Sequence, residues 1–296
     1  MISALASLLL QPDSTPAELL PPTGQPSAIT TGWTEEGELS VSWRTAVGSQ
    51  GGVLEVIREG VPPAKVEAVK VQTTEEGAAR WRALAKGREG RRLWWRVAAP
   101  AGKSPWGSAY VPSRTFQGTD FLIFGDAQAK ISSMSGQLFA KAAQVGRFSE
   151  FSLHAGDLID TNTSQKEWNE WLAAVKPLVR QGPIFATPGN HEYGKPGPFK
   201  GLSPLWNSLL THPANGPEDA KNTSWHMAWS GIMVASLDCM ADHKTGAAWL
   251  RSLPWKKAKW RILMTHFPVH VTMKGQERPG WTKLLDPAWQ IGRAHG

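Results

Sequence analysis

Two patterns of hydrophobic and polar residues divide the chain near residue 118. Upstream of it, short runs with a period of two are separated by turn residues, as where Leu39, Val41 and Trp43 alternate with polar neighbours. This alternation is typical of half-buried antiparallel strands. The same pattern predicts strands at 53–57, 66–71, 78–83 and 93–98, with turns at 48–52, 62–63 and 87–90. We therefore expect an all-β sandwich over residues 29–117.

Downstream of residue 118, apolar strand-like runs alternate with segments of helical period. The predicted strands are 119–124, 151–154, 223–229, 231–237 and 260–265, and the predicted helices are 135–145, 165–179 and 247–253. In the second helix the apolar residues share one face, and Ser164 is the expected N-cap. This alternation predicts an α/β domain over residues 118–296, in which a sheet lies between helices.

The first 28 residues show neither pattern and are predicted to be a leader or linker. Residues 11–28 are rich in Pro, Ser, Gly and Gln, which is typical of a linker or a disordered segment. Residues 1–10 are apolar, but no Lys or Arg precedes them and the run is short for a signal peptide. A signal-peptide remnant and a frayed leader both stay open. No run of eighteen apolar residues occurs, so no membrane span is predicted.

Composition and charge change this picture little. The formal net charge of +7 favours anionic partners, but the basic residues are scattered and give no clear signal for nucleic acid. Cys239 is the single cysteine and sits in an apolar run, where a buried thiol is expected. An internal disulfide is therefore excluded, and cysteine usage does not decide the compartment. Sixteen tryptophans are attributed to packing rather than to sugar or base stacking.

Three short motifs carry the candidate chemistry, and each follows an apolar run. They contain Gly125-Asp126, Gly156-Asp157 and Gly189-Asn190-His191. Asp157 lies 31 residues after Asp126, and Asn190 lies 33 residues after Asp157, which is about one βαβ unit per step. The three motifs should therefore meet at the carboxyl ends of the strands, and each glycine should allow a tight turn there.

The side chains in these motifs suit a metal site. Carboxylate and amide oxygens and imidazole nitrogens are common ligands of divalent ions. Two such ions can share a bridging carboxylate and activate a water for attack on phosphorus, and Asp157 is the central candidate for the bridge. A histidine beside the ions can stabilise phosphoryl charge or protonate a leaving alkoxide, with a carboxylate behind it fixing the tautomer. We therefore expect a two-metal phosphoesterase centre.

Four motifs together resemble the successive blocks of the calcineurin-like metallophosphoesterase superfamily. These are Phe124-Gly-Asp126-Ala-Gln128, Gly156-Asp157-Leu-Ile-Asp160, Gly189-Asn190-His191-Glu192 and Met264-Thr-His266-Phe-Pro268. The β-module before them, with Leu39-Ser-Val-Ser-Trp-Arg44, is similar to the fibronectin type III-like domain of bacterial purple acid phosphatase-like proteins. The resemblance covers about residues 32–289 and implies a four-layer α/β (α+β) phosphoesterase domain behind the sandwich.

The resemblance also implies roles for individual residues. The metal ligands would be Asp126, Asp157, Asn190 and His266, with Asp157 as the bridge. His191 would lie beside the phosphate and pair with Asp160, and both would be catalytic. Two divalent or trivalent ions (Fe, Zn or Mn) and a bridging hydroxide would hydrolyse a small phosphate ester. A secreted or periplasmic location is implied as well. His270 is either a rim residue that touches substrate or a solvent-facing one.

The chain departs from the superfamily at two places. Gln128 stands where most members have a histidine, so it is expected to be a weak amide-oxygen ligand or to orient a water. Asp160 stands where purple acid phosphatases have the tyrosine that gives them their colour, so a coloured protein is not expected. The last family block, Gly-His-x-His, has no match, and residues 291–296 align only loosely, with Arg293 in place of the first histidine.

We therefore expect the phosphoesterase domain to be incomplete at its C-terminus, with foreign sequence after Gln290, no ligand role for His295 and weakened metal binding. An alternative hypothesis is a non-catalytic surface or adhesion module that kept the fold and lost part of the metal site. Monoester and diester substrates both stay open. Metal identity and oligomeric state are not predicted.

Overall fold

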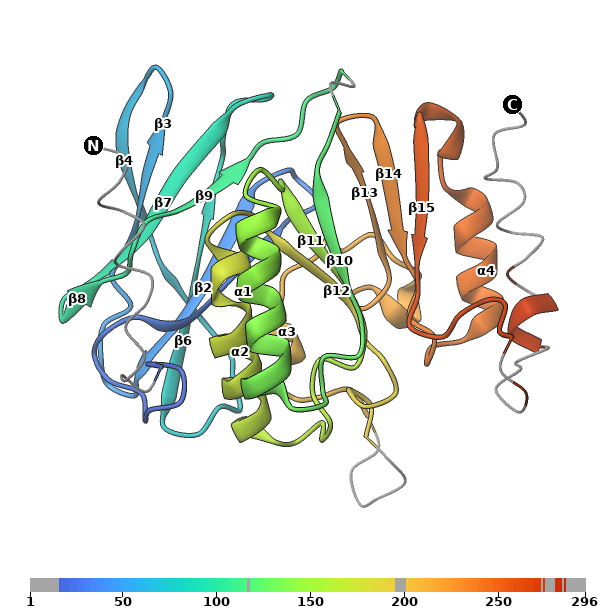
Figure 1. The fold of residues 1–296 in the computed structure, drawn as a ribbon. Coiled ribbons are helices and arrows are strands. Elements are labelled where there is room, and N and C mark those ends of the chain that lie inside the picture. Colours follow the sequence, from blue (N-terminus) through green and yellow to red (C-terminus); the bar gives the residue numbers. More distant parts are fainter. Residues whose placement is uncertain are drawn as a thin grey trace.

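The structure is a computed structural model, and it describes residues 16–115, 118–194, 201–272, 274, 280–283 and 285. Two β-sheets packed face to face form the first part of the chain, and two further sheets flanked by helices form the second (Figure 1). Among the described residues, none of the helices combines the length and the apolar character needed to cross a bilayer. The predicted order of an all-β sandwich followed by an α/β domain is confirmed.

The sandwich consists of two antiparallel sheets. One has the order β1 (Ser27–Trp33), β2 (Leu39–Ala46), β6 (Ala78–Ala85) and β5 (Val69–Val71). The other has the order β4 (Val61–Glu67), β3 (Val53–Arg58), β7 (Arg92–Ala99) and β8 (Gly102–Lys103), with β9 (Gly107–Tyr110) paired to β7.

The polar face of β2 is buried as fully as its apolar face. Leu39, Val41 and Trp43 are buried in the core of the sandwich. The polar face of β2 packs on the second domain, where Ser40 Oγ lies 3.0 Å from Thr211 Oγ1. Thus the period-two pattern identifies the strand correctly, but its polar side faces protein rather than water.

Two details of the sandwich differ from the sequence prediction. Residues 62–63 are not a turn, because Pro62 and Pro63 lie within β4, an outer strand in which a missing N–H is tolerated. The predicted strand 66–71 is split between the end of β4 and β5. In addition, β1 begins within the predicted linker, and Glu18 of that segment is buried.

The second domain holds a parallel sheet and a mixed sheet. The parallel sheet has the order β10 (Phe121–Phe124), β11 (Phe151–Ala155) and β12 (Ile184–Thr187). The mixed sheet has the order β13 (Trp225–Trp229), β14 (Ile232–Ser236) and β15 (Trp260–Met264), where only β13 is antiparallel to its neighbour. The longer helices are α1 (Gly136–Val145), preceded by the π-helical turn η2 (Ile131–Ser135), α2 (Gln165–Val179) and α4 (His243–Ser252). Short helical turns are α3 (Trp206–Leu209), η3 (Glu218–Ala220) and η4 (Trp255–Lys257).

Alternating side chains show four layers in this domain. On β11, Phe151 packs against Trp229 of the mixed sheet, whereas His154 packs against Trp171 of α2. On β14, Val234 belongs to the core between the two sheets, whereas neighbouring residues pack with Leu250 of α4. The layers are therefore α1 and α2, the parallel sheet, the mixed sheet and α4, as Figure 1 shows.

The helix boundaries follow local capping. Ser164 Oγ accepts a hydrogen bond from Glu167 N (3.2 Å), which confirms the predicted N-cap of α2. The helix α4 begins four residues before the predicted 247, because the side chain of Asp242 accepts from Thr245 N (2.7 Å) and caps it there.

Candidate metal centre

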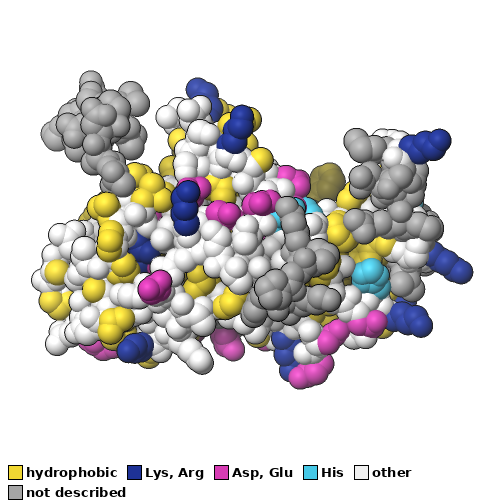
Figure 2. Space-filling model, turned by 90° about the horizontal axis from the view of Figure 1, so that it is seen from below, with side chains coloured by type: hydrophobic (Ala, Val, Ile, Leu, Met, Phe, Trp, Pro, Cys, Tyr) yellow, Lys and Arg dark blue, Asp and Glu magenta, His cyan; other side chains and the backbone are white. Residues whose placement is uncertain are grey.

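Three predicted ligands meet at the carboxyl ends of the strands. Asp126 follows β10, Asp157 follows β11 and His266 follows β15. One ligand atom from each lies within 4.8 Å of the other two. Viewed from this end of the strands, histidine and acidic side chains lie together near the middle of the face (Figure 2). The strand spacing in the sequence thus brings these motifs to one place.

The backbone at the two aspartates is strained. Asp126 and Asp157 have φ values of 53° and 52°, in the left-handed region that non-glycine residues rarely occupy. The two turns are joined by hydrogen bonds from Asp126 N to Gly156 O (3.2 Å) and from Gln128 N to Asp157 O (2.9 Å). These bonds hold the strained turns beside each other, with both carboxylates at the strand ends.

The glycines have different roles. A Cβ on Gly189 would lie 2.1 Å from Asp157 Oδ1, so a larger residue there would displace the carboxylate. Gly156 has φ +84° and its Cβ would lie 2.8 Å from His266 Cβ. By contrast, Gly125 has no positive φ and faces nothing closer than 3.9 Å. The left-handed turn after β10 is therefore made by Asp126 rather than by the preceding glycine, contrary to the sequence prediction.

Acceptor atoms face one another at the centre of the cluster. His266 Nδ1 lies 2.9 Å from Ala155 O, which can only accept, so this nitrogen carries a proton and Nε2 faces the cluster. That Nε2 lies 3.2 Å from Asn190 Oδ1 and 3.4 Å from Asp157 Oδ2. An imidazole nitrogen, an amide oxygen and a carboxylate oxygen this close require a cation or a second proton on the imidazole. This donor set, with His266 Nδ1 bonded to the carbonyl of Ala155, fits a metal ion.

The pKa values of the central pair reflect the same contact. Burial opposes the charge on Asp157, but hydrogen bonds from His266 and from the His191 N–H hold the pKa of this carboxyl below its ordinary value. Burial also opposes protonation of His266, but Asp157 outweighs it and raises the imidazole pKa. The site thus favours a carboxylate with positive charge beside it.

Gln128 also lies in the cluster. Its Nε2 donates to Asp157 Oδ2 at 3.2 Å. Its Oε1 is buried and has no hydrogen-bond partner within the described part of the chain. The amide therefore touches the predicted bridging carboxylate, and it has an acceptor oxygen to offer.

His191 and Asp160 form the predicted pair. His191 Nδ1 lies 3.1 Å from Asp160 Oδ1 and 2.8 Å from Asp160 O. Since both partners are acceptors, Nδ1 carries the proton and Nε2 faces the cluster, 3.7 Å from Asp157 Oδ2. The Asp160 turn is itself held by Glu167, which accepts from Asp160 N (2.9 Å).

Glu192 is a contact that the sequence motif did not reveal. Its side chain is fully buried, and its carboxylate accepts hydrogen bonds from four backbone N–H groups of the ligand loops. Burial raises the pKa of this carboxyl to about 7, and the N–H donors oppose the shift. A glutamate directly after Asn190 and His191 in the third motif was the available signal.

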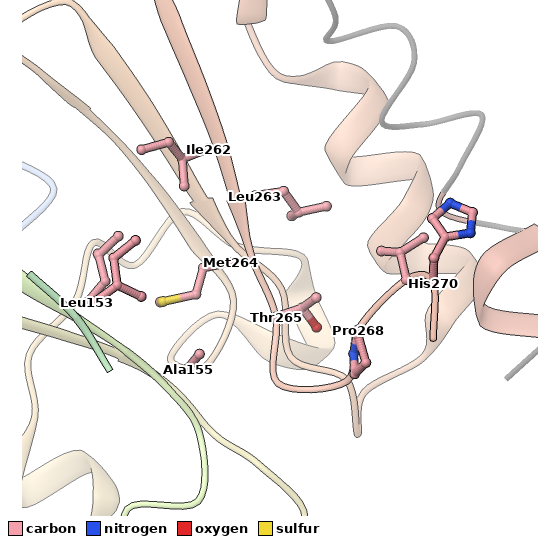
Figure 3. Close-up of a pocket in the computed structure, with 10 residues that line it drawn as sticks. Leu153, Ala155, Ile262, Leu263, Met264, Thr265, Pro268 and His270 are labelled. Carbon is pink, nitrogen blue, oxygen red and sulfur yellow. The ribbon is translucent and has the colours of Figure 1, made fainter. Parts of the chain in front are cut away.

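His270 lies apart from these residues. It is exposed and lines a cavity of about 360 Å³ whose other walls are mostly apolar. In Figure 3, Ile262 and Met264 point toward Leu153, whereas His270 lies at the opposite end of the cavity. A substrate contact by His270 stays a prediction. Arg293 and His295 fall outside the described residues.

Comparisons with known proteins bear on the family and the fold. The sequence model of the calcineurin-like phosphoesterase family matches residues 120–291. Among solved structures, purple acid phosphatase PPD1 from yellow lupin (Lupinus luteus) seeds is similar, with a TM-score of 0.69 and 15% identity over 84% of this chain and 52% of that one. PhoD is similar with a TM-score of 0.62 and 11% identity, over 95% of this chain and 70% of that one. The chain thus spans about half the length of the lupin phosphatase. No curated protein shows significant similarity to it.

Proposed function

The chain belongs to the calcineurin-like phosphoesterase family, and we propose that it is a metal-dependent phosphoric ester hydrolase with a dinuclear centre. One observation carries the proposal: His266 Nε2 lies 3.2 Å from Asn190 Oδ1 and 3.4 Å from Asp157 Oδ2, while its Nδ1 is bonded to Ala155 O. The similarity of the fold to a purple acid phosphatase and to PhoD supports a phosphate ester as substrate.

The proposed ligands come from four loops of the domain. Asp126, Asp157, Asn190 and His266 would hold the two ions, with Gln128 as an amide ligand in place of an imidazole. Such ions supply Lewis acidity toward the phosphoryl oxygens and lower the pKa of water at the site. The convergence on Asp157 supports its role as the shared carboxylate, because His266, His191 and Gln128 all approach its Oδ2.

His191 is the proposed proton donor. Its Nδ1–H is held by both oxygens of Asp160 that face it, so the ring presents Nε2 to the cluster. A carboxylate at Nδ1 stabilises the imidazolium, and Nε2–H of that form can protonate the leaving alkoxide. The pair therefore supports an ester with a poor leaving group better than a metal centre alone would.

A single substitution tests the proposal. Asp157→Asn removes the carboxylate on which the other groups converge, and should abolish both Mn²⁺ binding and hydrolysis of p-nitrophenyl phosphate and bis-p-nitrophenyl phosphate. Asp120→Asn, an exposed aspartate just before β10, is the matched control and should leave both unchanged. Undiminished Mn²⁺ binding or hydrolysis by Asp157→Asn would refute the ligand assignment. Metal binding without hydrolysis of either ester in the unmodified chain would favour the non-catalytic alternative, for which Gln128 is the motivating departure.

A further inference from the structure

We propose that Glu192 is a positioning residue for the metal centre: its buried carboxylate holds the two loops that carry Asp157 and Asn190 in one fixed arrangement. The inference rests on the proposed function, because it assigns metal affinity to the loops that Glu192 joins. No role for this residue followed from the ligand motifs themselves.

The four hydrogen bonds connect both loops to one side chain. Glu192 Oε2 accepts from Asp157 N (2.9 Å) and from Gly189 N (2.7 Å). Oε1 accepts from Leu158 N (2.7 Å) and from Ile159 N (3.2 Å). Three of these donors belong to the loop after β11 and the fourth to the loop after β12. Each oxygen therefore has two N–H donors.

Glu192 continues the connection between β11 and β12 where the sheet stops. The last paired residues of the two strands are Ala155 and Thr187, and both loops lie beyond that pair. Beyond the Ala155–Thr187 pair, the Glu192 carboxylate accepts hydrogen bonds from both loops. His191 N donates one further hydrogen bond to Asp157 Oδ1 (3.1 Å). Because Asp157 has a left-handed φ of 52°, its backbone needs such an external restraint to keep that conformation.

Only a carboxylate suits this position. Four donors require four lone pairs, and an ionised glutamate has two oxygens that accept and nothing that donates. Glutamine at the same place would turn an NH₂ group toward two backbone N–H groups, so two of the four N–H groups would lose their acceptor. Aspartate would keep the charge but withdraw the carboxylate by one methylene. Among the described residues, no Lys or Arg forms an ion pair with Glu192, so oriented amide dipoles supply the compensation.

Metal affinity distinguishes a positioning role from a merely structural one. Mn²⁺ affinity of the purified chain is measured by equilibrium dialysis at a temperature at which each variant is folded by circular dichroism. Glu192→Gln should bind Mn²⁺ roughly 10- to 100-fold more weakly, the usual effect of removing an outer-shell partner. The control Glu75→Gln alters another fully buried carboxylate, in the sandwich, and should lose stability but keep its affinity. Glu150→Gln, at the opposite end of β11, is a second control.

The outcomes separate the two proposals. Wild-type Mn²⁺ affinity in Glu192→Gln, together with loss of binding in Asp157→Asn, would overturn the positioning role and leave the ligand assignment intact. Unchanged binding in Asp157→Asn would instead overturn the assignment.

A measurement on the unmodified chain covers the case in which the Glu192 variants do not fold. Amide hydrogen exchange of Asp157, Leu158 and Gly189 should be slow without added metal, because a buried carboxylate accepts all three. Rapid exchange at these amides would also overturn the inference.

Discussion

The protein contains two clusters of buried charge, and they are built in opposite ways. In the sandwich, Glu75 lies between Arg44 (2.7 Å) and Arg80 (2.8 Å), and all three side chains are buried. At the strand ends of the second domain, Asp157 Oδ2 and Asn190 Oδ1 both face His266 Nε2. The first cluster is complete without any ligand, whereas the second requires either a cation or a second proton on the imidazole of His266. The balance of donors and acceptors, rather than burial, distinguishes a structural network from a binding site.

The sandwich cluster joins three parts of the chain. Arg44 donates to Asn169 Oδ1 on α2 (2.9 Å) and to the carbonyl of Glu18 in the leader segment (2.7 Å). Burial opposes the charge on Glu75, but Arg80 and Arg44 outweigh it and hold the pKa of the carboxyl below its ordinary value. This network therefore fixes the sandwich to the second domain, and its ionisation is stable at neutral pH.

The largest expected loss of stability comes from breaking the Arg44–Glu75–Arg80 network of the sandwich, here called the closed cluster. Glu75→Gln leaves two buried guanidinium groups without their carboxylate, and removing one partner of a buried ion pair costs about 3 to 5 kcal/mol. Urea unfolding followed by tryptophan fluorescence measures the loss. Glu59→Gln removes a carboxylate from an exposed pair with Arg91 and should give no measurable change. A small loss in Glu75→Gln would show that the two clusters do not differ as described.

The second cluster, formed by Asp157, Asn190 and His266 and here called the open cluster, should instead make the stability of the protein depend on metal. At a Mn²⁺ concentration about 100 times the dissociation constant, an ion that binds only the folded state adds about 2.7 kcal/mol to the free energy of unfolding. This gain should be present in Glu75→Gln, which keeps the open cluster, and absent in Asp157→Asn. Thermal unfolding with and without Mn²⁺ is the measurement. Equal gains in both variants would place the binding site elsewhere.

The sequence predicted the open cluster better than the closed one, for a physical reason. Asp126, Asp157 and Asn190 follow strands at βαβ spacing, so chain topology alone brings them together. The Arg44–Glu75–Arg80 network depends on side-chain contacts between strands and a loop, and no spacing rule encodes it.

Other parts of the fold were hidden by local composition. The strand β1 begins inside a stretch that looks like a linker. It pairs antiparallel with β2, and its Thr31 Oγ1 donates to Gly182 O of the second domain (2.9 Å). The role of Glu192 was likewise invisible, because its partners are backbone N–H groups that every residue type presents. Tertiary contacts, which lie beyond local pattern, decide both features.

A third buried titratable group, His154, differs from both clusters and should have a smaller effect on stability. His154 packs against Phe139 and Trp171, and burial lowers its pKa to about 3. Unlike the charged groups of the two clusters, the His154 imidazole is neutral in the folded protein at neutral pH. Between pH 6.5 and 3 the unfolded chain binds a proton here that the folded chain does not, so stability falls as the pH falls through this window.

His154→Phe removes that proton uptake while keeping a ring among the same aromatic neighbours. The unfolding free energy of the unmodified chain should drop by about 1 kcal/mol more than that of the variant between pH 6.5 and 5.5, because the imidazole of the unfolded chain goes from about half to about nine-tenths protonated over this range. Urea unfolding at the two pH values measures the difference. His212, whose pKa burial also lowers to about 3, is present in both proteins and cancels. Identical pH dependence in the two proteins would mean that His154 is charged or hydrated in the folded state, and that burial alone does not keep this core neutral.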